Sequence, residues 1–114
     1  MTPGAASSVL TVMIVDDEAP ARARLRDLLA DIAPQLANEV VCEAPDGRAA
    51  LASIERRWVD VLLVDIRMPR MDGIELARHL LHFEPRPAVV FVTAFDAYAV
   101  RAFELNAVDY LLKP

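Results

Sequence analysis

The chain has 114 residues, of which 55% are hydrophobic and 25% are charged. This length and balance fit one compact domain with a packed core and exclude a second core-bearing domain. Its 17 acidic residues outnumber the 12 basic ones, giving a formal net charge of −5, so a broad positive face for nucleic acid is not expected and we predict no direct nucleic-acid binding by this segment.

The single cysteine, Cys42, excludes an intrachain disulfide and is compatible with a reducing cytoplasm, which is the expected location. No apolar run approaches the length that crosses a bilayer, so contact with a membrane is not expected. Residues 1–8 have neither the basic nor the apolar segment of a signal peptide. We expect them to form a flexible leader, followed by one folded domain over residues 9–114.

Five short runs rich in branched aliphatic residues alternate with segments of helical pattern. Most runs are apolar at consecutive positions, which is typical of strands buried on both faces of a parallel sheet. The alternation predicts an α/β fold with five parallel strands and short connections. The expected strands are Val9–Val15, Val40–Glu43, Val59–Val64, Ala88–Val92 and Val108–Leu112.

Helix start signals lie between these strands. An acidic first turn and an early proline predict a helix opening at Asp17-Glu18-Ala19-Pro20. Aspartate caps predict further helices opening at Asp46-Gly47, at Asp72-Gly73, and after Asp96 over residues 97–105. The side chains expected to face the sheet are Ala21, Leu25, Leu28, Leu29 and Ile32 in the first helix, Ala50, Leu51, Ile54 and Trp58 in the second, and Leu76, Ala77, Leu80 and Leu81 in the third.

The fourth predicted helix carries two apolar stripes with the same helical spacing. One consists of Ala99, Val100 and Phe103, which can face the sheet. The other consists of Tyr98, Ala102 and Leu105. An exposed apolar stripe on this helix would be a partner-binding surface, the alternative being a short helix that is apolar all round.

Polar side chains follow four of the five predicted strands. Asp16-Asp17-Glu18 follows the first strand, Asp65 the third, Thr93-Ala94 the fourth, and Lys113 the fifth. Because the carboxyl ends of parallel strands meet at one edge of a sheet, we expect these groups to converge there.

Such a cluster of carboxylates requires a counter-charge. Two like charges about 4 Å apart repel by about 4 kcal/mol at the effective dielectric near a protein surface, and one lysine does not offset three acids. Mg²⁺ prefers carboxylate oxygens while keeping water and phosphate in its coordination shell. The pattern therefore predicts a magnesium-dependent phosphoryl site, with Asp65 as nucleophile and Lys113 and Thr93 meeting the remaining phosphoryl charge.

The same residues form the motifs of a known family. From about Val9 to Pro114 the chain resembles the receiver domain of bacterial two-component response regulators. Thr93–Ala99 and Ala107–Tyr110 are further similar to receivers that precede LytTR-type DNA-binding domains, the LytR/AlgR group. The motifs that carry the family resemblance are Val15-Asp16-Asp17-Glu18, Asp65-Ile66-Arg67-Met68-Pro69, Thr93-Ala94 and Tyr110-Leu111-Leu112-Lys113-Pro114.

The resemblance implies a chemical role for the acidic positions. Asp65 would accept a phosphoryl group from a sensor histidine kinase, and the domain would catalyse its own phosphorylation and dephosphorylation without a separate substrate. Mg²⁺ would be held by Asp16, Asp17 and Asp65 and by the backbone carbonyl of Arg67. Arg67 and Phe95 stand at positions that tune the phosphate lifetime in the family.

The resemblance also implies a switch and a fold. Lys113 and the backbone of Ala94 would bind the phosphoryl group, while Thr93 and Tyr110 would be the switch residues. Lys113-Pro114 would be a cis peptide. The implied fold is flavodoxin-like, a doubly wound parallel sheet of strand order 2-1-3-4-5. Phosphorylation would change the surface of helix 97–105 and the last strand, and so control an output such as transcription by a following DNA-binding domain.

The main departure from the family is that the chain ends before the expected fifth helix. A homodimer is therefore expected either through the surface of helix 97–105 and the last strand or through the sheet face that this helix would cover. A stand-alone relay receiver is an alternative output. A Mg²⁺-dependent phosphatase of the haloacid-dehalogenase type is a further alternative, although that class needs a second acid where this chain has Arg67.

Overall fold

The computed structural model describes residues 8–113 of the chain. Most of the expected leader and Pro114, with its expected cis peptide, lie outside the described residues, as do the side chains of Val100 and Phe103. Among the described helices, none is both long and apolar enough to cross a membrane.

Five parallel strands form one sheet in the order β2-β1-β3-β4-β5. This order confirms the doubly wound topology, in which the chain reverses direction across the sheet beside β1. Each strand begins or ends within two residues of its predicted bounds. The observed strands are β1 (Leu10–Val15), β2 (Asn38–Ala44), β3 (Val61–Val64), β4 (Ala88–Thr93) and β5 (Asp109–Leu112).

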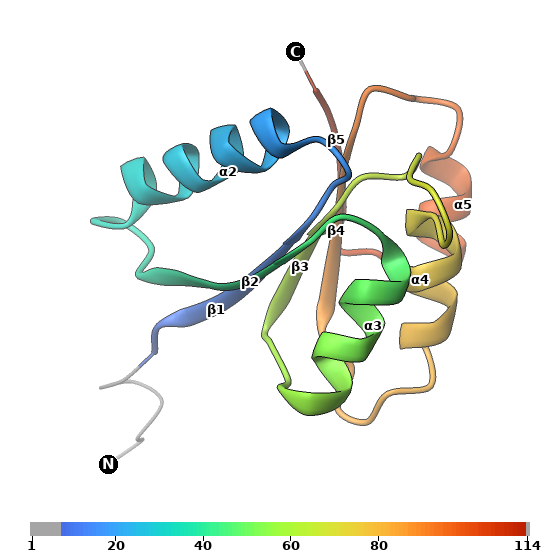
Figure 1. The fold of residues 1–114 in the computed structure, drawn as a ribbon, viewed down its shortest axis with the longest axis horizontal. Coiled ribbons are helices and arrows are strands. Elements are labelled where there is room, and N and C mark those ends of the chain that lie inside the picture. The colour runs from blue at the N-terminus through green and yellow to red at the C-terminus, as the bar shows by residue number, and fades with distance from the viewer. Residues whose placement is uncertain (1–7, 114) are drawn as a thin grey trace.

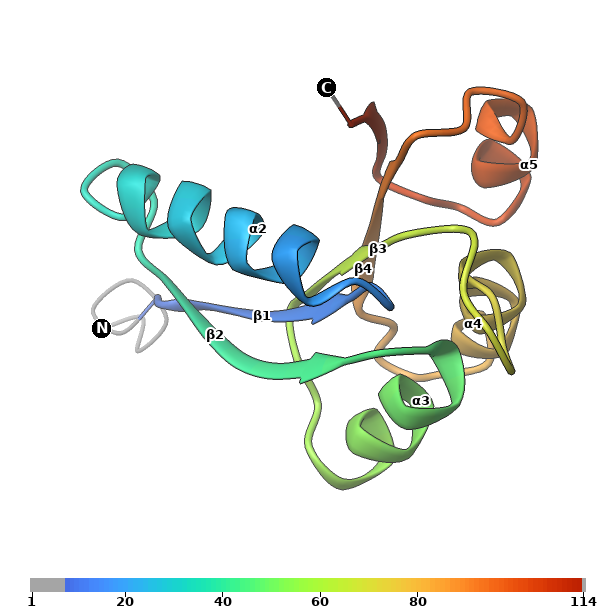
Figure 2. The same cartoon turned by 45° about the horizontal axis from the view of Figure 1, so that its top comes forward.

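Helices cover the two faces of the sheet unequally (Figure 1). Among the helices of residues 8–113, α2 alone lies on one face, whereas α3, α4 and α5 lie on the other, and Figure 2 shows the same division from a second direction. The helices are α2 (Ala19–Ile32), α3 (Gly47–Arg56), α4 (Gly73–Leu80) and α5 (Ala99–Glu104).

The core lies between the sheet and the helices α3, α4 and α5. Ala50 and Ile54 of α3 and Leu76, Ala77 and Leu80 of α4 are buried, as predicted from their spacing. They pack with strand residues that are fully shielded from solvent, namely Met13, Val15, Leu62, Val64 and Phe91. Val12 and Ile14, which alternate with Met13 and Val15 along β1, are also buried, so this central strand is apolar at consecutive positions because both of its faces are covered.

The opposite face of the sheet is only partly covered within residues 8–113, as the expected absence of a fifth helix implies. Leu28 is 53% exposed and Ile32 is 43% exposed, and no residue of α2 is buried. Their expected burial was wrong because, within residues 8–113, no second helix packs beside α2 on this face. An apolar groove of about 250 Å³ remains between α2 and the sheet, lined by Ala21, Arg24, Leu25, Leu28, Leu63, Val92, Leu111, Leu112 and Lys113.

Of the two apolar stripes of α5, the second lies against the core. Ala102 and Leu105 are buried in the core, and Tyr98 is half-buried against it. The chain turns toward β5 at Asn106, whose φ of 60° is a left-handed conformation that asparagine tolerates just after a helix end.

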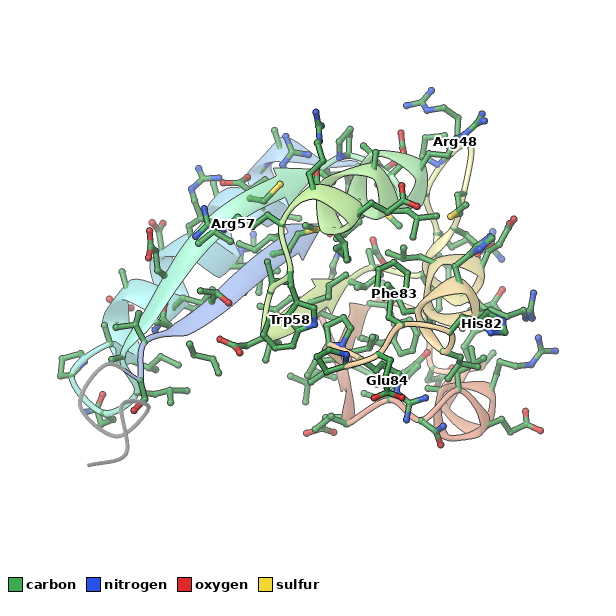
Figure 3. The ribbon with its side chains drawn as sticks, turned by 90° about the horizontal axis from the view of Figure 1, so that it is seen from below. Arg48, Arg57, Trp58, His82, Phe83 and Glu84 are labelled. Atoms are coloured by element: carbon green, nitrogen blue, oxygen red, sulfur yellow. The ribbon has the colours of Figure 1, made fainter. Side chains whose placement is uncertain are left out.

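Trp58 does not lie on the inward face of a helix, contrary to prediction. The helix α3 ends at Arg56, and Trp58 is 43% exposed. Its indole N–H donates a hydrogen bond to the carbonyl of Pro85 at 3.1 Å, which places the ring beside the segment that precedes β4 (Figure 3). The ring therefore joins the connection before β3 to the connection before β4, at the end of the sheet opposite the strand-end polar residues.

Candidate functional site

The carboxyl ends of the strands bring the predicted polar residues to one edge. Backbone hydrogen bonds continue past the strand ends, from Asp65 to the Val15 carbonyl at 2.9 Å and from Lys113 to the Thr93 carbonyl at 2.8 Å. Asp16, Asp65 and Thr93 are buried, with exposed fractions of 1%, 7% and 0%. A buried carboxylate requires polar partners, because an unpaired charge in the interior is costly.

Lys113 is the shared partner of two of these carboxylates. Its Nζ donates to Oδ2 of Asp16 at 2.7 Å and to Oδ2 of Asp65 at 3.0 Å. Burial on its own lowers the pKa of the ammonium, but the hydrogen bonds to Asp16 and Asp65 outweigh it, so the pKa of Lys113 is raised above its ordinary value. The lysine is therefore held charged between the two acids.

Asp16 also belongs to a second cluster of acidic side chains, directly after β1. Oxygen atoms of Asp16, Asp17 and Glu18 lie within 4.8 Å of one another, with Asp16 buried and the other two exposed. The Glu18 N–H also donates to Oδ1 of Asp16 at 2.9 Å, which orients the buried carboxylate. Hard oxygen donors that meet at a partly open edge fit Mg²⁺, whose coordination shell combines one or two carboxylates with water and phosphate. Glu18 belongs to this group although it was not among the predicted ligands.

The backbone after Asp65 is held close to the carboxylate. Oδ1 of Asp65 accepts from the Ile66 N–H at 2.7 Å, and the Gly73 N–H donates to the Ile66 carbonyl at 2.8 Å. A side chain on Gly73 would overlap the carbonyl oxygen of Asp65. Only glycine lets the first turn of α4 approach the acceptor so closely. Arg67, whose carbonyl is a predicted ligand, lies within the loop closed in this way.

The two predicted switch residues meet at Phe95. The Oγ1 of Thr93 accepts from the Phe95 N–H at 3.4 Å, and the Tyr110 hydroxyl donates to the Phe95 carbonyl. The Tyr110 ring also lies 6.0 Å from the Phe91 ring, centroid to centroid. Burial raises the pKa of the Tyr110 phenol, so the hydroxyl keeps its proton and acts as a donor. Ala94, between these groups, is exposed.

Two arginines have contacts that sequence reasoning missed. The Arg67 guanidinium lies 4.7 Å from the centroid of the Phe95 ring, so a cation–π contact joins the loops after β3 and β4. Arg22 lies on α2, on the face opposite its apolar side chains in the sequence pattern. It donates from Nη1 to the Asp16 carbonyl at 2.7 Å and from Nε to Glu43 at 3.1 Å. No sequence signal distinguishes such an arginine from its exposed neighbours.

Comparison with known proteins identifies the family. The family model described as "Response regulator receiver domain" matches residues 12–114. The chain belongs to this family. The receiver fold and the two-component resemblance inferred from the strand-end motifs are thereby confirmed, whereas the comparisons leave the LytTR subtype open.

Curated relatives and a solved receiver agree with this assignment. An uncharacterized response regulatory protein of Vibrio cholerae is 53% identical over 91% of this chain and 39% of its own length. The transcriptional regulatory protein BtsR of Salmonella typhi is 46% identical over 93% of this chain and 43% of its own length. The crystal structure of the response regulatory domain of mrkE from Klebsiella pneumoniae has a TM-score of 0.86 and 38% identity, and the match covers 92% of this chain and 84% of that one. This receiver therefore spans about two fifths of the length of the curated relatives.

Proposed function

We propose that this receiver accepts a phosphoryl group on Asp65 in a Mg²⁺-dependent reaction and passes the signal through the surface formed by α5 and β5. Receiver domains are phosphorylated by histidine kinases and generally use Mg²⁺. In the proposed step an oxygen of Asp65 forms an O–P bond while the P–N bond of a kinase phosphohistidine breaks, and the imidazole leaves with the bonding electron pair.

The single observation that supports this proposal is the position of Lys113. Its ammonium contacts both Asp16 and Asp65, so the proposed nucleophile and a proposed metal ligand face one cation. Mg²⁺, when bound, would neutralise charge on Asp16, Asp17 and the phosphoryl oxygens. Lys113 would then turn from Asp16 to the phosphoryl group, while the Ala94 backbone and the Thr93 hydroxyl meet the other oxygens.

Intact-mass spectrometry after incubation with acetyl phosphate tests the chemistry. With Mg²⁺ the chain should gain the mass of one phosphoryl group, and chelation of the metal should abolish the gain. Asp65→Asn should remain unmodified, whereas Asp31→Asn, a matched change on the exposed side of α2, should react normally. A folded, unsubstituted chain that stays unmodified contradicts the proposal.

The contacts of Phe95 suggest how the signal would leave the site. If the phosphoryl group draws the Thr93 hydroxyl toward it, the hydroxyl leaves the Phe95 N–H, and the loop that holds Tyr110 is freed to change. Thr93→Ala should then still be phosphorylated, but α5 and β5 should keep the amide chemical shifts of the unmodified chain. A Thr93→Ala variant whose shifts change as in the unsubstituted receiver contradicts this coupling.

The output we propose is transcription control by a following DNA-binding domain of LytTR type. The sequence motifs after β4 and before β5 favour this group, and several curated relatives are named as transcriptional regulatory proteins. A relay receiver is the alternative, and the coding sequence downstream of Pro114 distinguishes the two. Dimerisation through the α5–β5 surface, or through the apolar groove beside α2, is checked by sedimentation before and after phosphorylation.

A further inference from the structure

A buried aspartate outside the acidic cluster is paired with an arginine from the loop that follows Asp65. Asp46 follows β2, is only 3% exposed, and caps α3 by accepting the Ala49 N–H at 2.9 Å. Its other oxygen, Oδ2, accepts from Nε of Arg70 at 2.7 Å. The pair joins the connection between β2 and α3 to the connection between β3 and α4.

Arg70 occupies a backbone conformation that disfavours it. Its φ is 66°, in the left-handed region where a residue with a Cβ is strained relative to glycine. Neither helix packing nor burial retains the arginine there, because its side chain is 59% exposed. The ion pair with Asp46 is the contact that offsets the strain, since hydrogen bonds to a buried carboxylate are among the stronger ones in proteins.

A backbone contact runs parallel to this ion pair. The Gly47 N–H donates to the Met71 carbonyl at 2.9 Å, and a Cβ on Gly47 would stand 2.7 Å from that oxygen. The Met71 N–H donates in turn to the Pro69 carbonyl at 2.8 Å, which tightens the turn around Arg70. Figure 3 shows this end of α3, marked by Arg48, beside the loop that precedes α4.

We propose that Asp46 and Arg70 are positioning residues, a clamp that sets the conformation of residues 66–72 and, through it, the geometry around Asp65. This proposal rests on the proposed function, because the clamped loop contains the Arg67 carbonyl expected to contact Mg²⁺. The hydrogen bond from the Gly73 N–H to the Ile66 carbonyl closes this loop. A contact that fixes Arg70 therefore limits the backbone conformations of the other residues between 66 and 73. Neither residue touches the reacting atoms.

Arg70→Gly tests the clamp without endangering the fold. Glycine removes the ion pair and also relieves the left-handed backbone, so the melting temperature should stay close to that of the unsubstituted chain. Hydrogen exchange at the amides of Met71 and Gly73 should become faster. Isothermal titration with magnesium chloride should give a Kd about tenfold weaker, the lower end of the loss seen when groups that orient metal ligands are removed.

Three further variants separate positioning from general destabilisation. Asp46→Asn keeps the side-chain acceptor for the Ala49 N–H and should reproduce the exchange and titration results of Arg70→Gly. Arg70→Lys keeps the charge and should restore part of the magnesium affinity. Arg48→Met removes an exposed arginine that forms no ion pair within residues 8–113 and should change neither readout.

Unchanged magnesium affinity and unchanged exchange in both Arg70→Gly and Asp46→Asn would overturn the clamp. Failure of the proposed function has a different signature, in which the unsubstituted chain takes up neither magnesium nor a phosphoryl group. In that case faster exchange in Arg70→Gly still supports the clamp on residues 66–72, and unaltered exchange refutes it.

Discussion

Gly73 and Asp65 touch through their backbones, so that a methyl group on the Cα of Gly73 would overlap the carbonyl oxygen of Asp65. The first turn of α4 therefore lies directly against the proposed phosphoacceptor. This contact, together with the Gly73 N–H bond to Ile66, makes the start of a helix part of the site's framework. Its consequence is a strict size limit at one position that does not take part in the chemistry.

Gly73→Ala should destabilise the receiver by about 1–3 kcal/mol, because the backbone on both sides must shift to admit the methyl group. Urea unfolding measures the change. Gly47→Ala is the graded comparison, since its Cβ would stand 2.7 Å from the Met71 carbonyl oxygen, and it should cost less. A Gly73→Ala variant as stable as the unsubstituted chain would show that the helix is free to move away.

Lys113→Met should lower the stability by about 3 kcal/mol in the absence of magnesium, because it leaves Asp16 and Asp65 as buried charges without their cation. The same change should tighten magnesium binding, since the metal no longer competes with the ammonium. Chemical denaturation with and without the metal measures both effects. An increase in stability on mutation would contradict the pairing.

The raised pKa of Lys113 also predicts a pH dependence. Because its pKa is higher in the folded chain than the ordinary value of 10.5, the lysine contributes stability that is complete below that value and is lost as the pH rises through the folded pKa. The free energy of unfolding of the unsubstituted chain should therefore fall as the pH rises through the folded pKa of Lys113. In Lys113→Met this part of the fall should be absent. Identical alkaline profiles for the two chains would argue against the shift.

Asp46 predicts the opposite dependence at acid pH. The Ala49 N–H, and after it the Arg70 guanidinium, hold the pKa of Asp46 below its ordinary value of 3.8. Its contribution to stability is therefore present above 3.8 and is lost as the pH falls through the lower folded pKa. Acid denaturation should show this loss, and Asp46→Asn should remove it. A steeper acid profile in Asp46→Asn would reverse the assigned sign.

Magnesium should raise the melting temperature of the receiver, because an ion that binds only the folded state stabilises it by mass action, by about 2.7 kcal/mol at a hundred times its Kd. Scanning fluorimetry at constant ionic strength measures the shift. Asp16→Asn and Asp17→Asn should each reduce it, whereas Asp31→Asn should not. Equal melting temperatures with and without millimolar magnesium would count against a metal site.

The sequence predicted the sheet because its signal is local and strong. Consecutive apolar residues mark buried strands, and the aspartates before α3 and α4 do cap those helices, by accepting the N–H groups of Ala49 and Glu75. The residues proposed for the chemistry could also be predicted, because the residues at the carboxyl ends of parallel strands lie at one edge of the sheet. Asp16, Asp65, Thr93 and Lys113 needed only their place after a strand to be singled out.

Contacts between connections carry no comparable periodic signal. The pairing of Asp46 with Arg70, of Arg67 with Phe95, and of Arg22 with the Asp16 carbonyl depends on how separate loops approach in space. The same is true of α5, where the sequence offers two apolar stripes and the tertiary structure buries Ala102 and Leu105 of the second.

Composition and spacing by themselves thus determined the fold class, the strand-end cluster and its acidic character, because each follows from burial along a single strand or helix. Only the tertiary structure decided that Lys113 bridges Asp16 and Asp65 and that Leu28 and Ile32, on the apolar face of α2, stay exposed. Those outcomes depend on distances between segments far apart in the chain, and such distances leave no local pattern in the sequence.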